Sequence, residues 1–423
     1  MKAGSQKPRI CIALPGTDYV PHAPLLFANT LPMLPYLEEE FDVTVLFRKV
    51  LGKPQLDYKY STILDLSTLP NSEKTQSNAN FSPTGFFSAR RYLNTLNAFS
   101  KTHAKEFDLI IERQWSLVGA LSNAFKRHGV PSIFVVEAEF YTTKDVRIEH
   151  PVKRLSTALF KKWLPWLRRQ WIQKADGIIV ETEQMKSFLI EKHYARPNKP
   201  VYPIPNGIDP SIFFPRDRRT CREKLGIDQD SIVLTYVGSL NRFIQEPGPI
   251  IEALGREQPH NVVFQVIGDG MKRKELEQIA TKFNAPVVFR GRLPQQEAAL
   301  YIGAANLCIA PYNKSLFPEE KFTSASLKVC EYLACGRPVV TIPCGRMEHL
   351  LNRSQYGFLV QNDVASYQTF FRDFPDIDKI TTLEDSLITG LENSTLKAQR
   401  IVMSWQDIAE IYTQVIKENL TQQ

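Results

Sequence analysis

The stretch SASLKVCEYLACGRPVV, residues 324–340, combines a short apolar helix, a glycine stop and an apolar strand. A serine at its start can cap the helix, because a serine oxygen accepts a backbone N–H that has no partner inside the helix. Gly336 suits the left-handed position after a helix end, and Pro338 leads into a strand over 339–342. An apolar helix followed by an apolar strand predicts a buried layer of an α/β sheet.

Glu331 stands inside this apolar helix. It needs a hydrogen-bonding partner, because burying an unpaired carboxylate is costly. Lys328 lies three positions earlier on the same stripe, which is the weaker order for a helical ion pair. The partner of Glu331 is therefore either Lys328 or a group from outside the chain.

Short apolar strands alternate with helical patterns along the whole chain, which is typical of doubly wound parallel sheets. We expect strands at 9–14, 42–47, 108–112, 132–136 and 177–181, and then at 231–237, 262–267, 287–289, 307–310, 339–342 and 357–360. So many strands exceed one comfortable sheet, so the sequence predicts two doubly wound α/β domains, 1–200 and 201–403. The seam is the proline-rich segment 195–217, and residues 404–423 carry a final amphipathic helix.

The composition is that of an ordinary globular protein, with 43% hydrophobic and 23% charged residues among 423. The net charge of +7 favours anionic partners, although no nucleic-acid reader motif occurs. Six cysteines without a CxxC pair predict reduced core thiols and a cytoplasmic location. The N-terminal apolar run predicts a first strand, not a signal peptide, and no apolar run is long enough for a membrane span. The polar segment 68–85 predicts a long surface loop.

Several motifs occur in an order that resembles the family 4 retaining glycosyltransferases of GT-B fold. They are VYPIPNGIDPSIFFP (201–215), YVGSL (236–240), VIGDG (266–270), the segment 287–312, and the stretch that opens this section. Residues 108–137 resemble the fourth and fifth strands of that family. The resemblance implies two facing Rossmann-like domains with a nucleotide sugar in the cleft, and a last helix that crosses back to the first domain.

The resemblance assigns the donor site to the opening stretch. Glu331 matches the glutamate that holds the ribose hydroxyls, to which a carboxylate offers two charge-assisted bonds. The family's other glutamate falls at Thr323, which lacks a carboxylate, so the contact with the donor sugar is open. Ser324, Ser326 and Leu327 open the helix, whose free N–H groups suit a diphosphate.

Lys328 either adds a positive charge at this diphosphate position or is a solvated lysine. The strand matching YVGSL departs from the family pattern more seriously. After Gly238 the family has an arginine and a lysine that neutralise the leaving diphosphate. Ser239 stands at the place of the arginine, and Ile244 or Gln245 near that of the lysine. Arg242 is either a substitute diphosphate clamp or a surface arginine.

Four further residues are candidates by their position after strands. Arg290 flanks the place where the family holds the nucleobase. Gly16 follows the first strand and could let the backbone approach a sugar or phosphate. Glu112 and Arg113 end a strand that faces the same cleft, where they either hold substrate hydroxyls or pair with each other.

The segment 153–175 mixes basic residues with three tryptophans. This pattern indicates a helix lying on an anionic membrane, or a surface helix that packs on its own sheet. Pro165 predicts a kink or a break within it.

The sequence therefore predicts a cytoplasmic glycosyltransferase, peripheral on the inner face of the cell membrane. It would move a sugar from a nucleoside-diphosphate sugar to a saccharide or lipid-linked acceptor, with retention. No cofactor beyond this substrate and no metal are expected. Two alternatives stay open: a non-catalytic scaffold that binds glycan or nucleotide, motivated by Thr323 and Ser239, and a sugar-nucleotide epimerase.

Overall fold

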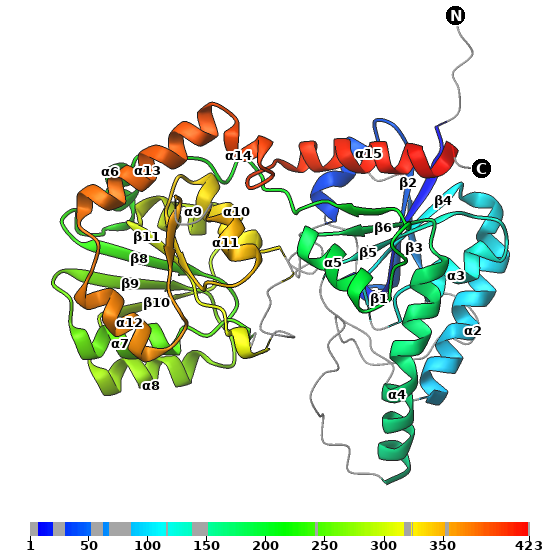
Figure 1. Cartoon of the computed structure of the whole chain (residues 1–423), viewed down its shortest axis with the longest axis horizontal. Helices are drawn as coiled ribbons and strands as arrows, with labels where there is room; N and C mark the ends of the chain where they lie inside the picture. Colours follow the sequence, from blue (N-terminus) through cyan, green and yellow to red (C-terminus); the bar gives the residue numbers. More distant parts are fainter. Residues whose placement is uncertain are drawn as a thin grey trace, which may run out of the picture. The chain divides into compact units, whose positions relative to one another are not determined.

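A computed structural model of the chain describes residues 7–19, 30–51, 62–66, 86–115, 117–137, 151–241, 244–316, 323, 325–351 and 355–421. The chain divides into two compact units (Figure 1). The first unit comprises Met1–Pro205 and Trp405–Gln423, and the second comprises Asn206–Ser404. The final helix therefore belongs to the first unit.

The first unit is built on a seven-stranded sheet in the order β3-β2-β1-β4-β5-β6-β7, in which all neighbours are parallel. Its strands are β1 (Arg9–Tyr19), β2 (Asp42–Val50), β3 (Thr62–Asp65), β4 (Leu109–Arg113), β5 (Ser132–Val136), β6 (Gly177–Val180) and β7 (Val201–Pro203). The helices are α1 (Leu34–Leu37), α2 (Phe86–His103), α3 (Ala120–Lys126), α4 (Pro151–Lys174), α5 (Glu183–Glu191) and α15 (Trp405–Thr421). The strand order reverses between β1 and β4.

The second unit has a six-stranded parallel sheet in the order β10-β9-β8-β11-β12-β13. Its strands are β8 (Ile232–Val237), β9 (Val262–Ile267), β10 (Val287–Gly291), β11 (Leu307–Ala310), β12 (Val339–Thr341) and β13 (Gly357–Leu359). The helices are α6 (Arg218–Leu225), α7 (Gly248–Glu257), α8 (Arg273–Phe283), α9 (Gln295–Ala304), α10 (Leu327–Ala334), α11 (Arg346–Leu350), α12 (Val364–Arg372), α13 (Ile377–Glu392) and α14 (Thr395–Ala398). The order reverses between β8 and β11, which is where ligands bind in sheets of this type.

Residues 325–340 fold as predicted. Ser326 caps α10, because its hydroxyl accepts the N–H of Val329 at 3.3 Å. Gly336 follows the helix with φ +67°, and the chain then enters β12, which lies between β11 and β13. The fold thus places the first turn of α10 after β11, beside the reversal point of the second sheet.

Two Rossmann-like, doubly wound parallel sheets are confirmed, and all eleven predicted strands are present. Two edge strands were missed. β3 is only four residues long, and β7 lies in the proline-rich segment, where an edge position tolerates proline. The six cysteines are buried and none is in a disulfide, as predicted. The segment 68–85 lies outside the described residues.

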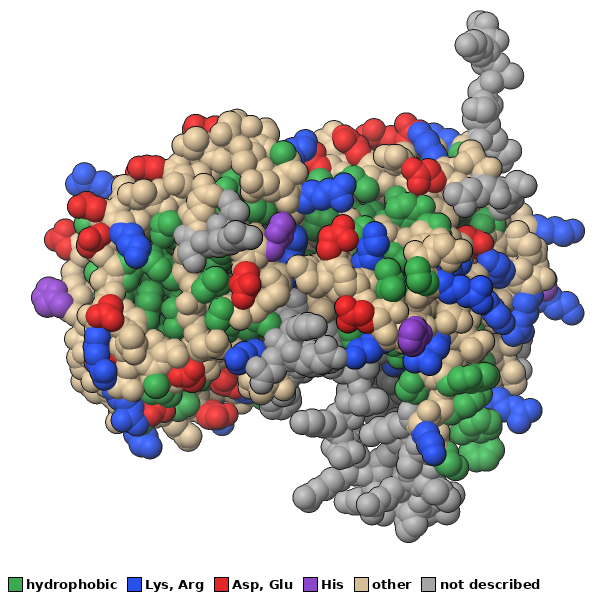
Figure 2. Space-filling view, viewed as in Figure 1, with side chains coloured by type: hydrophobic (Ala, Val, Ile, Leu, Met, Phe, Trp, Pro, Cys, Tyr) green, Lys and Arg blue, Asp and Glu red, His purple; other side chains and the backbone are tan. Residues whose placement is uncertain are grey.

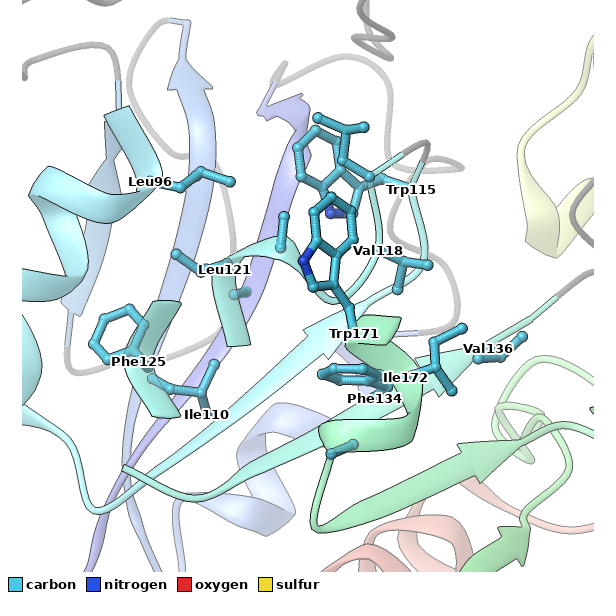
Figure 3. Packing of buried hydrophobic residues seen from close by; sticks show 14 of the residues in the cluster. Leu96, Ile110, Trp115, Val118, Leu121, Phe125, Phe134, Val136, Trp171 and Ile172 are labelled. Atoms are coloured by element: carbon cyan, nitrogen blue, oxygen red, sulfur yellow. The ribbon is translucent and has the colours of Figure 1, made fainter. Parts of the chain in front are cut away.

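α4 is a single helix that continues through Pro165, so the predicted break is absent. Its last turns are held in the core of the first unit, where Trp171 and Ile172 lie beside Phe134 of β5 (Figure 3). Phe160 and Leu164, before the proline, are buried in the same cluster, and this packing on both sides offsets the one backbone hydrogen bond that proline removes. Within the described residues, no helix is both long and apolar enough to cross a membrane.

Candidate functional site

The first turns of α10 contact the carboxyl end of β8. The Tyr332 hydroxyl accepts the N–H of Val237 at 2.8 Å and donates to the Val237 carbonyl at 3.1 Å. These two bonds fix α10 against the last residue of the strand. Glu331 and Lys328 are therefore held at the reversal point of the second sheet, where a ligand is expected.

Lys328 is buried, with only 8% of its surface exposed. Its ammonium donates to Oε1 of Gln245 at 2.8 Å and lies 4.2 Å from the centroid of the Tyr236 ring. The Tyr236 hydroxyl donates to the same Gln245 oxygen at 2.7 Å. A solvated lysine is thus excluded, because an amide oxygen and an aromatic face hold this cation in place.

The chain pairing after β8 and β11 explains how Gln245 reaches the lysine. Gln245 forms an antiparallel bridge with Tyr312, just after the end of β11. The backbone N–H of Glu246 also donates to the Pro311 carbonyl, and that of Asn313 to the Ile244 carbonyl. The loop after β8 is therefore tied down beside the start of α10.

The Glu331 carboxylate is half-buried and makes no hydrogen bond or ion pair with any residue that the structure describes. Burial raises its pKa to about 7, an effect that the charge of Lys328 partly opposes. The structure therefore rules out Lys328 as an ion-pair partner of Glu331. A carboxylate with this pKa and no donor among the described residues is suited to accept hydrogen bonds from a ligand.

The N-terminus of α10 lies beside this carboxylate. Ser326 uses its hydroxyl as the cap and also hydrogen-bonds the Tyr312 hydroxyl at 2.5 Å. Leu327 is the first helical residue, and Thr323 is buried ahead of it. Ser324 lies outside the described residues. Ser326 takes the N–H of Val329, and the N–H groups of the first turn point toward the helix start, which carries the positive end of the helix dipole and suits an anion.

The turn after β8 supplies a close backbone approach. A side chain at Gly238 would place its Cβ 2.5 Å from the Lys328 ammonium and 2.7 Å from the Tyr236 hydroxyl. Glycine is therefore required for the lysine to occupy its position. Ser239 accepts the N–H of Asn241 on its hydroxyl at 3.2 Å, so its side chain shapes the turn. Arg242 lies outside the described residues.

Arg290 is held by its own sheet. Its Nε donates to Gln265 Oε1 at 2.9 Å, and its guanidinium lies 5.5 Å from the centroid of the Tyr301 ring. The side chain is exposed at the end of β10. The structure thus gives it partners of its own and does not bring it into the cluster around Lys328.

Glu112 and Arg113 do not pair with each other, which contradicts one of the two predictions made for them. Glu112 is fully buried and accepts three N–H groups, from Trp115 Nε1 at 2.8 Å, Gly119 at 3.0 Å and Ser122 at 2.7 Å. Arg113 forms an ion pair with Glu137 and donates to the Tyr412 hydroxyl of α15. Both side chains therefore stabilise the fold.

Gly16 has a packing reason to be glycine. A Cβ there would lie 2.7 Å from the Trp115 side chain, whose indole is held by Glu112. The sequence reasoning missed the parts of the site that Tyr236 and Tyr312 supply. The signal available in the sequence was a tyrosine at or just after the end of each of two strands. Tyrosines at strand ends are also common in cores, so this signal does not identify a site.

Two family models match the chain. The model described as Glycosyltransferase Family 4 matches residues 33–212, and the one described as Glycosyl transferases group 1 matches residues 231–370. A D-inositol 3-phosphate glycosyltransferase of Nocardioides sp. is 24% identical over 325 residues, which is 72% of this chain and 65% of that protein. The chain spans roughly half to two thirds of the length of the curated relatives it matches.

Solved structures show the same fold. Sucrose-phosphate synthase from Thermosynechococcus elongatus has a TM-score of 0.69 at 16% identity, covering 99% of this chain and 100% of that one. Anabaena Alr3699/HepE in complex with UDP has a TM-score of 0.67 at 15% identity, covering 97% and 100%. At these identities the likeness concerns the fold.

Proposed function

Since this chain belongs to the family 4 glycosyltransferases and has their GT-B fold, we propose that it transfers a sugar from a nucleoside-diphosphate sugar to a hydroxyl acceptor. The acceptor is a saccharide or a lipid-linked glycan, and the reaction proceeds with retention. D-inositol 3-phosphate glycosyltransferases among its relatives, and similar structures that contain UDP or UDP-glucose, support sugar transfer from a nucleotide.

The observation that carries this proposal is the Glu331 carboxylate, which has no partner among the described residues and lies one helical turn after the buried Lys328. The two hydroxyls of a ribose donate to both oxygens of one carboxylate, which replaces the water that burial removes. Glu331 follows Lys328 by three positions, so the two side chains lie on one face about 5–6 Å apart at their Cβ atoms. A ribose and its attached diphosphate span such a separation.

Lys328 supplies the positive charge at the diphosphate in this proposal. Its ammonium lies 2.8 Å from Gln245, which stands near the place of the family lysine on the loop after β8. In this chain α10 thus supplies the cation, and its ammonium lies close to the place that the family lysine occupies on the loop after β8. The leaving diphosphate gains charge as the sugar bond breaks, so a fixed ammonium and the N–H groups of the α10 start stabilise it.

Peripheral contact with the inner face of the cell membrane, through residues 153–175, is part of the same proposal. A lipid-linked acceptor presents its sugar at a membrane surface. An enzyme that docks there meets its acceptor by diffusion in two dimensions.

A donor screen tests the function. The purified chain is incubated with nucleotide sugars, UDP-glucose first, and release of nucleoside diphosphate is measured with and without saccharide acceptors. We expect one donor to be hydrolysed slowly alone and faster with an acceptor, and NMR of the product to show the donor's anomeric configuration. Tight nucleotide binding without turnover would identify a scaffold, and conversion of the donor alone into its epimer would identify an epimerase.

A further inference from the structure

Five apolar side chains of the first unit form one surface patch, here called the two-helix patch: Phe86 and Phe87 of α2, and Leu159, Trp163 and Trp166 of α4. The three α4 residues are spaced by four and three positions and so share one face of the helix. Phe86 packs on Trp163 with ring centroids 5.4 Å apart, which joins the two helices. Phe87, Leu159 and Trp166 are 74%, 59% and 54% exposed.

An adjacent face of α4 is fixed in the core. Phe160, Leu164 and Trp171 are buried in the same hydrophobic cluster as β4 and β5. The patch is therefore presented by an anchored helix, and its exposure does not come from a detached element. Proteins that act as free monomers rarely expose contiguous large apolar side chains unless these have a binding role.

The two helices also carry the positive charge of the chain. Together α2 and α4 contain ten lysines and arginines and no aspartate or glutamate, whereas the whole chain has a net charge of +7. All other residues taken together are therefore net acidic. The ten are Arg90, Arg91, Lys101, Lys153, Arg154, Lys161, Lys162, Arg168, Arg169 and Lys174. Figure 2 shows hydrophobic side chains at the surface over this part of the unit, with lysines and arginines near them.

We propose that the two-helix patch and the basic residues around it form a docking surface for an anionic lipid bilayer. Exposed aromatic rings enter the headgroup region, while the exposed Lys162 and Arg90 contact anionic headgroups. The inference deepens the peripheral location proposed above by adding α2 to the surface, and it does not depend on sugar transfer.

Two other occupants fit the surface less well. An anionic polymer would contact the basic residues but would leave the aromatic side chains in water. A second copy of the chain would bring exposed cations such as Arg90, Arg91 and Lys162 against their equivalents across a two-fold axis, where like charges repel. A bilayer with anionic headgroups satisfies both the apolar and the charged components.

Co-sedimentation with vesicles tests the proposal. The full chain is mixed with vesicles of phosphatidylcholine alone or with about a third phosphatidylglycerol. We expect binding to the anionic vesicles only, and weaker binding at high salt, because screening reduces the charge component. The double variant Phe87→Ser with Trp166→Ser should bind at least tenfold more weakly, since each ring loses apolar burial. Lys162→Ala should cost about fivefold, from roughly 1 kcal/mol per charge near the surface.

Matched variants in the second unit serve as controls. Ile377→Ser removes an exposed apolar side chain and Lys274→Ala an exposed cation, and neither should alter vesicle binding. Far-UV circular dichroism confirms that each variant folds. The patch variants should retain UDP affinity in solution, whereas Glu331→Ala should lose UDP affinity and still bind vesicles. Failure of docking is thereby separated from failure of the proposed enzyme.

Three results would overturn the proposal. The first is equal binding of the wild type to neutral and anionic vesicles. The second is unchanged vesicle binding by the Phe87→Ser and Trp166→Ser double variant, even where Lys162→Ala weakens binding to heparin, which would identify a site for anionic polymers. The third is a vesicle-free dimer that the double variant converts to a monomer, which would identify an interface between copies.

Discussion

Two glutamates, one in each unit, are both removed from water but differ in their hydrogen-bond partners. Glu112 ends β4 in the first unit and Glu331 lies on α10 in the second, and burial raises the pKa of both. Glu112 accepts hydrogen bonds from three N–H groups of its own unit, at 2.7–3.0 Å. Glu331 accepts none from the described residues.

The difference separates a residue that builds the fold from one that waits for a ligand. The three donors of Glu112 close the loop between β4 and α3, so the carboxylate serves the backbone around it. The carboxylate of Glu331 has no such donor among the residues that the structure describes, so we expect its burial to be compensated when a ligand binds from solution. A ligand site is therefore indicated better by missing internal partners than by burial itself.

The largest expected effect is the loss of folding stability when Glu112 is replaced. Glu112→Ala should lower the free energy of unfolding of the first unit by about 3–5 kcal/mol, because it leaves buried N–H groups without an acceptor. Urea unfolding followed by tryptophan fluorescence measures this directly, since all five tryptophans lie in the first unit. Glu112→Gln keeps an acceptor oxygen and should cost less. If the alanine variant loses less than about 1 kcal/mol, Glu112 contributes little to folding and the contrast with Glu331 is wrong.

Glu331→Ala should do the reverse and leave folding intact while weakening nucleotide binding. We expect a loss of about 1.5–3 kcal/mol in UDP affinity by calorimetry, the range for hydrogen bonds to a charged group. The 2′,3′-dideoxy analogue of UDP provides the matched ligand control. Wild type should bind the analogue about as weakly as the variant binds UDP, and the variant should not distinguish the two. Unchanged UDP affinity in a folded variant contradicts the ribose role.

A charge exchange sharpens the assignment of the diphosphate position. Lys328→Gln should weaken UDP binding by about tenfold and leave uridine binding unchanged, because only the diphosphate needs the cation. Gln245→Lys in the same chain returns an ammonium to the contact now 2.8 Å long and should restore most of the UDP affinity. Equal losses for UDP and uridine would show that Lys328 acts only in packing.

The fold was largely predictable from the sequence, because a parallel sheet buried on both faces needs continuous apolar strands. Strands such as β5 and β11 are recognisable in the sequence as continuous apolar runs. The helix α10 is recognisable by its serine cap and by Gly336 after its end. β7 did not, since three residues in a proline-rich segment carry no periodic signal.

The site was predictable in its residues and less so in their contacts. The pattern identified Glu331, and the structure added the absence of a partner among the described residues. The sequence could not show whether Lys328 is solvated or functional. Its contacts Gln245 and Tyr236 lie about 80–90 positions away in the chain, so only the fold brings them together. The sequence did not show that Glu112 and Arg113 have separate partners, because these come from the loop and helix after β4, from Glu137 and from α15.

The smallest expected effect is a pH dependence, which tests the environment of Glu331 itself. Uridine is the appropriate ligand, because the diphosphate of UDP titrates in the same range. With a pKa of about 7, the carboxylate is ionised at pH 8 and mostly protonated at pH 5.5, so uridine affinity should fall about tenfold between them. Glu331→Gln should remove this dependence.

As the pH rises, the folding stability of the ligand-free protein should fall, whereas its uridine affinity should increase. A folded-state pKa of about 7, above the ordinary 4.5, means that protonation favours the folded form. This contribution is fully present below pH 4.5 and is lost as the pH rises through 7. Hydrogen exchange of α10 should therefore quicken relative to Glu331→Gln as the pH rises, once the intrinsic rates are divided out, while uridine affinity increases. A binding midpoint near 4.5 would mean that water reaches Glu331 freely, and the contrast with Glu112 would then rest on hydrogen bonding alone.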